Sequence, residues 1–218
     1  FYPYYMQTYL ERDVRSLSGV PDMLEFSRFI GLCAGRVGQP LNKNNLAADA
    51  GITVPTVNKW LSILQASFLI YLLPPYYKNF NKRLTRQPKL YFTDTGLLSW
   101  YLGIHTADAL ENHYLKGAVF ENYVIQEFLK KYRHFARPAN IYFWRDDKGN
   151  EVDVIAEQEG RTYAYEIKSA STFHERFFKS LAYWQKISNI PAAQTAVIYA
   201  GDQQLDSGQG RLIPWQNI

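Results

Sequence analysis

The stretch that decides the fold is NEVDVIAEQEGRTYAYEIKS, residues 150–169. Polar and apolar residues alternate in two runs, and a short polar segment that contains Gly160 separates them. This alternation is typical of a β-hairpin with one buried face and one polar face. Glu166 and Lys168 are two residues apart on the second strand, so they share a face.

The position of Asp153 depends on the length of the hairpin connection. A four-residue connection, 158–161, pairs Glu157 with Thr162. The same register pairs Asp153 with Glu166 and puts both carboxylates on the polar face. A three-residue connection turns Asp153 to the opposite face, because a slip of one residue exchanges the two faces of a strand. Both registers are open from the sequence.

A fourth polar residue, Glu121, lies on a predicted helix. The segment GAVFENYVIQEFLKKY, residues 117–132, has helical periodicity, and Glu121 shares a stripe with Ile125 and Phe128 that should pack inward. A carboxylate on an apolar stripe is costly unless it is paired or bound to a metal. Glu121 is therefore the strongest internal sign of a site.

Two interpretations of Glu121, Asp153, Glu166 and Lys168 follow. Two or three oxygen ligands suit Mg²⁺, which keeps several of its own waters. Such a metal lowers the pKa of a bound water and stabilises charge on a phosphoryl group, and a lysine orients that water. The alternative is a solvent-exposed hairpin with a cross-strand cluster of acids and a lysine, which is common. Spacing alone favours this second interpretation.

Composition sets broad limits. The chain has 218 residues, 47% hydrophobic, which is enough for one large domain or two small ones. A net charge of +4 permits nucleic-acid binding without requiring it. Cys33 is the only cysteine, which excludes an intrachain disulfide and fits a cytoplasmic location. No apolar run is long enough to span a membrane. The chain begins with Phe1, and we expect it to be part of a longer protein.

The chain divides into a helical half and an α/β half. Residues 1–104 predict helices and a winged helix-turn-helix, with the helix-turn-helix at about 42–73 and the wing at about 69–92. Gly51 ends the first helix of this motif and Thr53 caps the second. Residues 105–218 alternate helix, strand, hairpin, helix and strand, which predicts an α/β domain with a mixed sheet.

Basic and aromatic residues alternate between Pro74 and Thr93, where no acid occurs. They suit phosphates and stacked bases. The equal alternative is a solvated loop whose aromatic side chains pack on the neighbouring domain. Lys59 adds one cation on the second helix of the motif. Arg145, just before the hairpin, adds another, for which a surface salt bridge is favoured over a phosphate contact. The candidate nucleic-acid-binding residues are Lys59, Lys78, Lys82, Arg83, Arg86, Lys89 and Arg145. With one cation on its second helix, the motif slightly favours protein docking over base reading.

A resemblance covers nearly the whole chain. The matching stretches are YLERDV (9–14), LAADAGITVPTVNKWLSILQASFLIYLLPPYYKN (46–79), KRL (82–84), PKLYFTDTGL (88–97), FEN (120–122), YFWRDDKGNEVDVIAE (142–157) and EIKS (166–169). Together they resemble the C-terminal part of bacterial and archaeal AAA-type ATPases that end in a domain of unknown function of the DUF4143 type. The order of Glu121, Asp153 and Glu166-Ile167-Lys168 resembles the PD-(D/E)XK nuclease-like superfamily.

The resemblance implies a winged helix followed by a restriction-endonuclease-like (PD-(D/E)XK) domain, and an ATPase domain preceding Phe1. No P-loop motif occurs, so we expect no ATP site in this chain. It also implies that Asp153, Glu166 and the Ile167 carbonyl hold Mg²⁺ or Mn²⁺. Lys168 would orient the water and Glu121 would assist.

Two functions are therefore open. One is a Mg²⁺-dependent phosphodiesterase that acts on DNA or RNA. The other is a catalytically inactive module that binds DNA or protein and regulates the attached ATPase, since a fold does not establish an activity.

Overall fold

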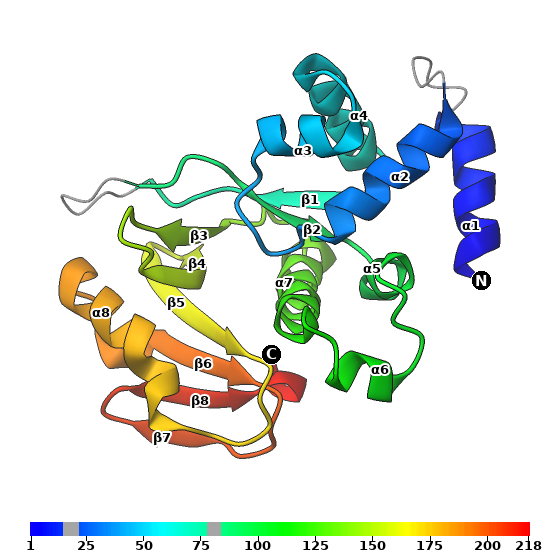
Figure 1. Cartoon of the computed structure of the whole chain (residues 1–218). Helices are drawn as coiled ribbons and strands as arrows, with labels where there is room; N and C mark the ends of the chain where they lie inside the picture. The colour runs from blue at the N-terminus through cyan, green and yellow to red at the C-terminus, as the bar shows by residue number, and fades with distance from the viewer. Residues whose placement is uncertain (15–21, 78–83) are drawn as a thin grey trace. The chain divides into compact units, whose positions relative to one another are not determined.

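The computed structural model describes the backbone of residues 1–14, 22–77 and 84–218 (Figure 1). Three of the predicted nucleic-acid-binding residues, Lys78, Lys82 and Arg83, lie outside the described residues.

Contacts between residues divide the chain into two units. The first contains Phe1–Leu72 and Leu90–Tyr114, and the second contains Leu73–Lys89 and Leu115–Ile218. The sequence predicted one division, between residues 104 and 105. The structure instead assigns most of the segment between the two predicted wing strands to the second unit.

Helices dominate the first unit. They are α1 (Tyr2–Thr8), α2 (Met23–Ala34), α3 (Lys43–Ala50), α4 (Val54–Ala66), α5 (Thr95–Tyr101) and α6 (Ala107–Glu111), with a π-helical turn at Tyr9–Val14. Aromatic rings connect α2 to α4 in the core. Trp60 meets Phe26 and Phe29 edge-on, with ring centroids 5.3 and 5.2 Å apart. Edge-to-face pairs of this kind stabilise a core beyond the area that they bury.

The predicted helix, glycine turn and second helix are present. Gly51 ends α3 in the left-handed conformation, with φ of 67°. Thr53 caps α4 by accepting a hydrogen bond from the Thr56 amide. Two strands follow, β1 (Ile70–Leu73) and β2 (Lys89–Phe92), and they pair into a two-stranded sheet. The assignment of these elements to a winged helix stays a prediction.

The second unit is built on a mixed sheet, as the sequence predicted, and this sheet has six strands in the order β3-β4-β5-β6-β8-β7. Its elements are α7 (Lys116–His134), β3 (Ile141–Arg145), β4 (Glu151–Gln158), β5 (Arg161–Lys168), α8 (Lys179–Ser188), β6 (Thr195–Tyr199), β7 (Leu205–Ser207) and β8 (Gly210–Pro214). The strands from β3 to β5 are antiparallel, whereas β6 is parallel to β5 and β8. The sequence missed β7 and β8.

Helices α7 and α8 cover opposite faces of this sheet (Figure 1). Tyr165 of β5 meets Phe128 of α7, with ring centroids 5.0 Å apart. Its neighbour Ala164 points to the other face and joins a buried cluster with Leu181 and Trp184 of α8. Because neighbouring residues of a strand face opposite ways, β5 contributes to both layers of the core.

The hairpin has the register that a connection over residues 158–161 predicted, although Gln158 and Arg161 themselves pair and only Glu159 and Gly160 form the turn. Glu157 lies opposite Thr162, and the pairing continues to Val154 opposite Tyr165. Regular pairing ends there, one residue short of Asp153 and Glu166, which the same register would bring opposite each other. On its other side β4 shifts register against β3, so that two residues of β4, Asp153 and Val154, face one residue of β3. A β-bulge of this kind redirects side chains and is frequent beside functional sites.

The two ends of the segment between β1 and β2 pair with the edge strand β3. The Tyr76 amide donates to the Phe143 carbonyl at 2.7 Å, and the Thr85 amide donates to the Arg145 carbonyl at 3.1 Å. The Tyr76 ring packs against Tyr142. For Tyr76, the interpretation as a packed aromatic side chain is therefore confirmed. The pairing also covers part of an open sheet edge, which otherwise invites association.

Substitution of Gly51 tests the turn between α3 and α4. We expect Gly51→Ala to lower the free energy of unfolding by about 1 kcal/mol, because alanine adopts a positive φ at a cost. No atom lies within 4 Å of the added Cβ, so the cost is conformational rather than steric. Urea unfolding followed by circular dichroism measures it. Gly51→Asn is the matched control and should lose less; equal stability of the alanine variant and the wild type would contradict this account.

Candidate functional site

The second unit gathers acidic and basic side chains in what we call the carboxylate cluster. It comprises Glu121 of α7, Glu151 and Asp153 of β4, Glu166 and Lys168 of β5, and Lys89 of β2. The sequence predicted four of these as site residues, and it assigned Lys89 to another role and missed Glu151. Six charged groups therefore lie together around the end of the β4–β5 hairpin.

Asp153 lies where the regular pairing of β4 with β5 ends. Its Oδ2 accepts a hydrogen bond from the Ile167 backbone N–H at 2.7 Å. The last regular backbone pair is Val154 with Tyr165. Beyond that pair, the carboxylate of Asp153 takes the place that a strand carbonyl would otherwise occupy. The bulge thus holds the Asp153 carboxylate between the two strands.

Glu166 is buried, with 5% of its surface exposed. Its Oε1 accepts hydrogen bonds from Lys168 Nζ at 2.5 Å and from Ser180 Oγ at 3.4 Å. Its Oε2 has no hydrogen-bond partner among the residues that the structure describes. A buried carboxylate oxygen without a donor is costly, so this atom is a natural place for a cation to bind.

Lys89 lies in the interior rather than on an exposed wing. Only 1% of its surface is exposed, and its Nζ lies 3.0 Å from Glu121 Oε1 and 2.5 Å from Glu151 Oε1. The ammonium also stands 5.4 Å from the centre of the Phe143 ring. The expectation that Lys89 contacts phosphate from the surface is therefore wrong. All four residues of β2 are buried. The three apolar residues that follow Lys89 in sequence could have predicted a buried strand.

Glu151 connects Lys89 to Arg145. Its Oε1 pairs with Lys89, and its Oε2 accepts a hydrogen bond from Arg145 Nη1 at 3.1 Å. Both oxygens of Glu151 therefore face cations. Arg145 forms the salt bridge that the sequence favoured over a phosphate contact.

Burial perturbs two acids of neighbouring strands, Asp153 and Glu166. Burial and then the charge of Glu166 raise the pKa of Asp153 well above its usual range. Burial also raises the pKa of Glu166, although the ammonium of Lys168 opposes this rise. Two carboxylates that resist ionisation together need a shared proton or a bound cation.

Lys168 stays protonated in this environment. Burial by itself lowers the pKa of Lys168, but the charge of Glu166 outweighs burial, and the pKa is raised overall. The side chain is therefore a hydrogen-bond donor and a positive charge at neutral pH. It is suited to orient a water or a phosphate oxygen, and not to accept a proton.

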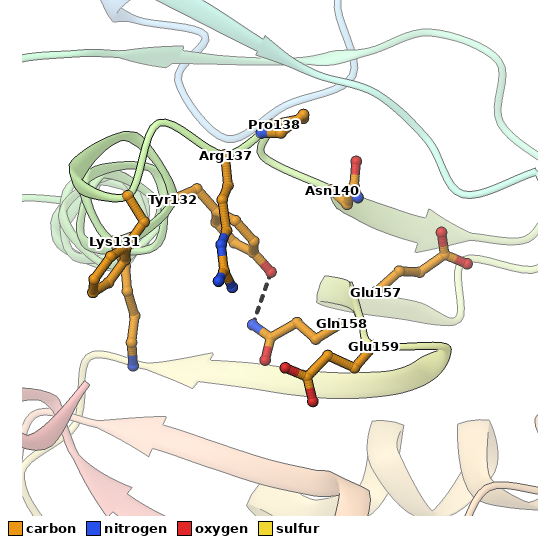
Figure 2. Close-up of a pocket in the computed structure, with 9 residues that line it drawn as sticks. Lys131, Tyr132, Arg137, Pro138, Asn140, Glu157, Gln158 and Glu159 are labelled. Carbon is orange, nitrogen blue, oxygen red and sulfur yellow. Dashed lines mark hydrogen bonds between the residues drawn. The ribbon is translucent and has the colours of Figure 1, made fainter.

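The remaining predicted residues lie elsewhere. Lys59 on α4 and Arg86 between β1 and β2 have exposed side chains. A separate hollow of about 330 Å³ lies beside the turn of the β4–β5 hairpin, lined by residues that include Tyr132, Arg137 and Glu159 (Figure 2). In it, Gln158 Nε2 donates a hydrogen bond to the Tyr132 hydroxyl at 2.8 Å. No member of the carboxylate cluster lines this hollow.

A metal ion fits only part of the carboxylate cluster. In residues 1–14, 22–77 and 84–218, no three His, Cys, Asp or Glu side chains are placed to hold a metal ion by themselves. Mg²⁺, however, commonly uses one or two carboxylates and takes its other ligands from water and substrate phosphates. The unpartnered Oε2 of Glu166, beside Asp153, suits this smaller ligand set. The Ile167 carbonyl, which lies between Glu166 and Lys168 in sequence, is the expected third ligand.

Comparisons with known proteins match the two parts of the chain separately. Residues 116–218 match the family model of a domain of unknown function, DUF4143, which confirms that part of the predicted resemblance. Residues 1–108 match another domain of unknown function, DUF8612. The two models meet close to the boundary between Tyr114 and Leu115 that separates the two units.

Two curated relatives cover most of the chain. They are the uncharacterized proteins Rv2008c of Mycobacterium tuberculosis and Mb2031c of Mycobacterium bovis, each 30% identical over 200 residues. The match covers 92% of this chain but only 44% of each relative, so the chain spans less than half of their length. No solved structure matched the chain. None of the helices in the described parts is long and apolar enough to cross a membrane.

Replacing Asp153 tests the electrostatic cost of the site. Because the pKa of Asp153 is raised on folding, its contribution to stability is present at acidic pH and is lost as pH rises through the raised pKa. We expect Asp153→Asn, measured in EDTA, to be more stable than the wild type at neutral pH. The difference should shrink towards pH 4, near the usual range of carboxyl groups, about 3.9 for aspartate.

Urea unfolding across this pH range measures the effect. The exposed Asp147 is the control position, and Asp147→Asn should show no such pH-dependent gain. An Asp153→Asn variant that is less stable than the wild type at neutral pH would show that ionised Asp153 stabilises the fold.

Proposed function

We propose that the second unit is a metal-dependent phosphodiesterase domain of the PD-(D/E)XK nuclease-like type, acting on nucleic acid. The observation that carries the proposal is the buried Oε2 of Glu166, which has no partner among the described residues. This oxygen lies in the same cluster as a second perturbed acid, Asp153, and a protonated lysine, Lys168. A metal-dependent phosphodiesterase uses this combination of cation ligands and a fixed positive charge.

The order of elements supports the proposal. Helix α7 carries Glu121, the second strand of the antiparallel set carries Asp153, and the third carries Glu166 and Lys168. Helix α8 and the parallel strand β6 follow. The same order of acids and lysine on helix and successive strands underlies the resemblance to the PD-(D/E)XK superfamily.

Each side chain then has a chemical task. Asp153, Glu166 and the Ile167 carbonyl would hold Mg²⁺ or Mn²⁺, which supplies a bound water of lowered pKa and stabilises charge on the phosphoryl group. Lys168 donates hydrogen bonds to the attacking water or to a phosphate oxygen. Since its ammonium is already fixed by Glu166, it needs little rearrangement during the reaction.

Both units supply the proposed nucleic-acid contacts, the first through Lys59 and the second through Arg86. Helices α3 and α4, the glycine turn and the paired strands β1 and β2 are consistent with a winged helix. Lys59 and Arg86 are exposed cations that suit the phosphate backbone. With few cations on α4, we propose backbone contacts rather than reading of base sequence.

The proposal also includes an ATPase domain in the same polypeptide. The curated relatives are more than twice as long as their matched part, and the resemblance places an AAA-type ATPase domain before such a region. We propose that the two units work in the cytoplasm beside an ATPase module in the same polypeptide.

A second candidate function is a non-catalytic module that binds DNA or protein and regulates that ATPase. The observation that favours it is the pairing of the acids with lysines: Lys89 bridges Glu121 and Glu151, and Lys168 holds Glu166. Such internal pairing can preserve a nuclease-like fold without a metal.

A cleavage assay separates the two functions. We expect the purified chain to cut plasmid DNA or single-stranded RNA with MgCl₂ or MnCl₂, and EDTA to abolish cutting. Asp153→Ala and Lys168→Ala should each lower the cleavage rate on the order of 100-fold or more, because each removes a group that acts on the transition state. Circular dichroism checks that both variants are folded.

Lys186→Ala is the control, since it removes an exposed lysine of α8 outside the carboxylate cluster. Binding of DNA without cleavage under either metal would support the regulatory module. The absence of both binding and cleavage would make protein docking the function to test.

A further inference from the structure

Lys89 has no place in the order of residues that suggests a nuclease. It comes from β2, ahead of the helix that begins that order, and yet its ammonium lies inside the carboxylate cluster. Its exposed fraction is 1%, the lowest of the six charged members that the structure brings together. A lysine that is this deeply buried must be compensated by nearby negative charge.

The compensation is specific. Glu121 Oε1 and Glu151 Oε1 lie 3.0 and 2.5 Å from Lys89 Nζ. Burial alone lowers the pKa of Lys89, but the charges of Glu121, Glu151 and Asp153 together outweigh burial and raise it, so the side chain is charged. A positive charge is therefore fixed between two acids that come from different elements, α7 and β4.

The two halves of the cluster differ in how their carboxylate oxygens are paired with cations and hydrogen-bond donors. In the half formed by Glu121 and Glu151, Lys89 contacts both carboxylates, and Arg145 occupies the second oxygen of Glu151. In the half formed by Asp153 and Glu166, the Oε2 of Glu166 has no partner in the described part of the chain. Among the described residues, the half formed by Asp153 and Glu166 is therefore the part of the cluster where a further cation would be stabilised.

We propose that Lys89 takes the position of a divalent cation between Glu121 and Glu151, so that the cluster binds one metal ion and not two. The inference deepens the proposed function and rests on it for the ion at Asp153 and Glu166. Glu121 is then a partner of Lys89 and a positioning residue, rather than a metal ligand. Lys89 fixes the number and the place of the ions that the cluster accepts.

Removing the charge of Lys89 tests this proposal. Lys89→Met keeps the length of the side chain but removes the cation that lies between Glu121 and Glu151. Titration with MnCl₂, followed by calorimetry and by the electron paramagnetic resonance signal of free Mn²⁺, counts the ions bound to each chain. We expect one ion in the wild type and two in Lys89→Met.

Two control variants define the second ion. Lys89→Arg keeps the charge and should bind the same number of ions as the wild type. The double variant Lys89→Met/Glu151→Gln should lose the added ion, because Glu151 is one of its ligands. Equal stoichiometry in Lys89→Met and the wild type overturns the proposal.

The same titration separates this inference from the proposed function. If the wild type binds no Mn²⁺ and Lys89→Met binds one, the role of Lys89 holds while the metal site at Asp153 and Glu166 fails. If neither chain binds Mn²⁺, both proposals fail.

Folding of the variant is itself informative. Should Lys89→Met be unfolded in EDTA, circular dichroism is repeated after refolding with MnCl₂. Recovery of the folded spectrum supports the exchange of lysine for a divalent cation. A variant that stays unfolded with MnCl₂ shows that the ion cannot replace Lys89, and this result overturns the inference.

Discussion

Burial of carboxylates at the end of a sheet is the constraint on which the second unit depends. Four acids, Glu121, Glu151, Asp153 and Glu166, converge where the pairing of β4 and β5 ends. Negative charges this close repel one another and oppose folding unless cations accompany them. Two lysines supply part of the required charge. Positive charge is still lacking beside Glu166, because its Oε2 has no hydrogen-bond partner among the described residues.

The backbone of β4 makes this arrangement possible. The bulge opposite Phe143 interrupts the alternation of side chains and allows Asp153 to accept a hydrogen bond from the Ile167 amide. A regular ladder would put a carbonyl there and point the carboxylate elsewhere. The bulge in β4 and the position of the Asp153 carboxylate are therefore linked. Acids with perturbed pKa values cluster at functional sites, so this part of the sheet is consistent with a role in catalysis or binding.

Local patterns predicted much of the fold, because register, caps and amphipathic stripes depend on neighbouring residues. The register of the hairpin and the inward position of Glu121 could be predicted in this way. Lys89 could not, because its neighbours in sequence are loop cations while its partners in space are 32 and 62 residues away. Strands β7 and β8 were missed because their three- and five-residue runs carry little periodicity.

The central claim is that Asp153 and Glu166 bind a divalent cation while Lys89 keeps Glu121 and Glu151 from doing so. Anomalous diffraction from crystals of the chain soaked in MnCl₂ tests it most directly. The account predicts one peak in contact with oxygens of Asp153 and Glu166, with Lys89 still bonded to Glu121 and Glu151. A peak between Glu121 and Glu151 with Lys89 displaced, or no peak in the cluster, would contradict it.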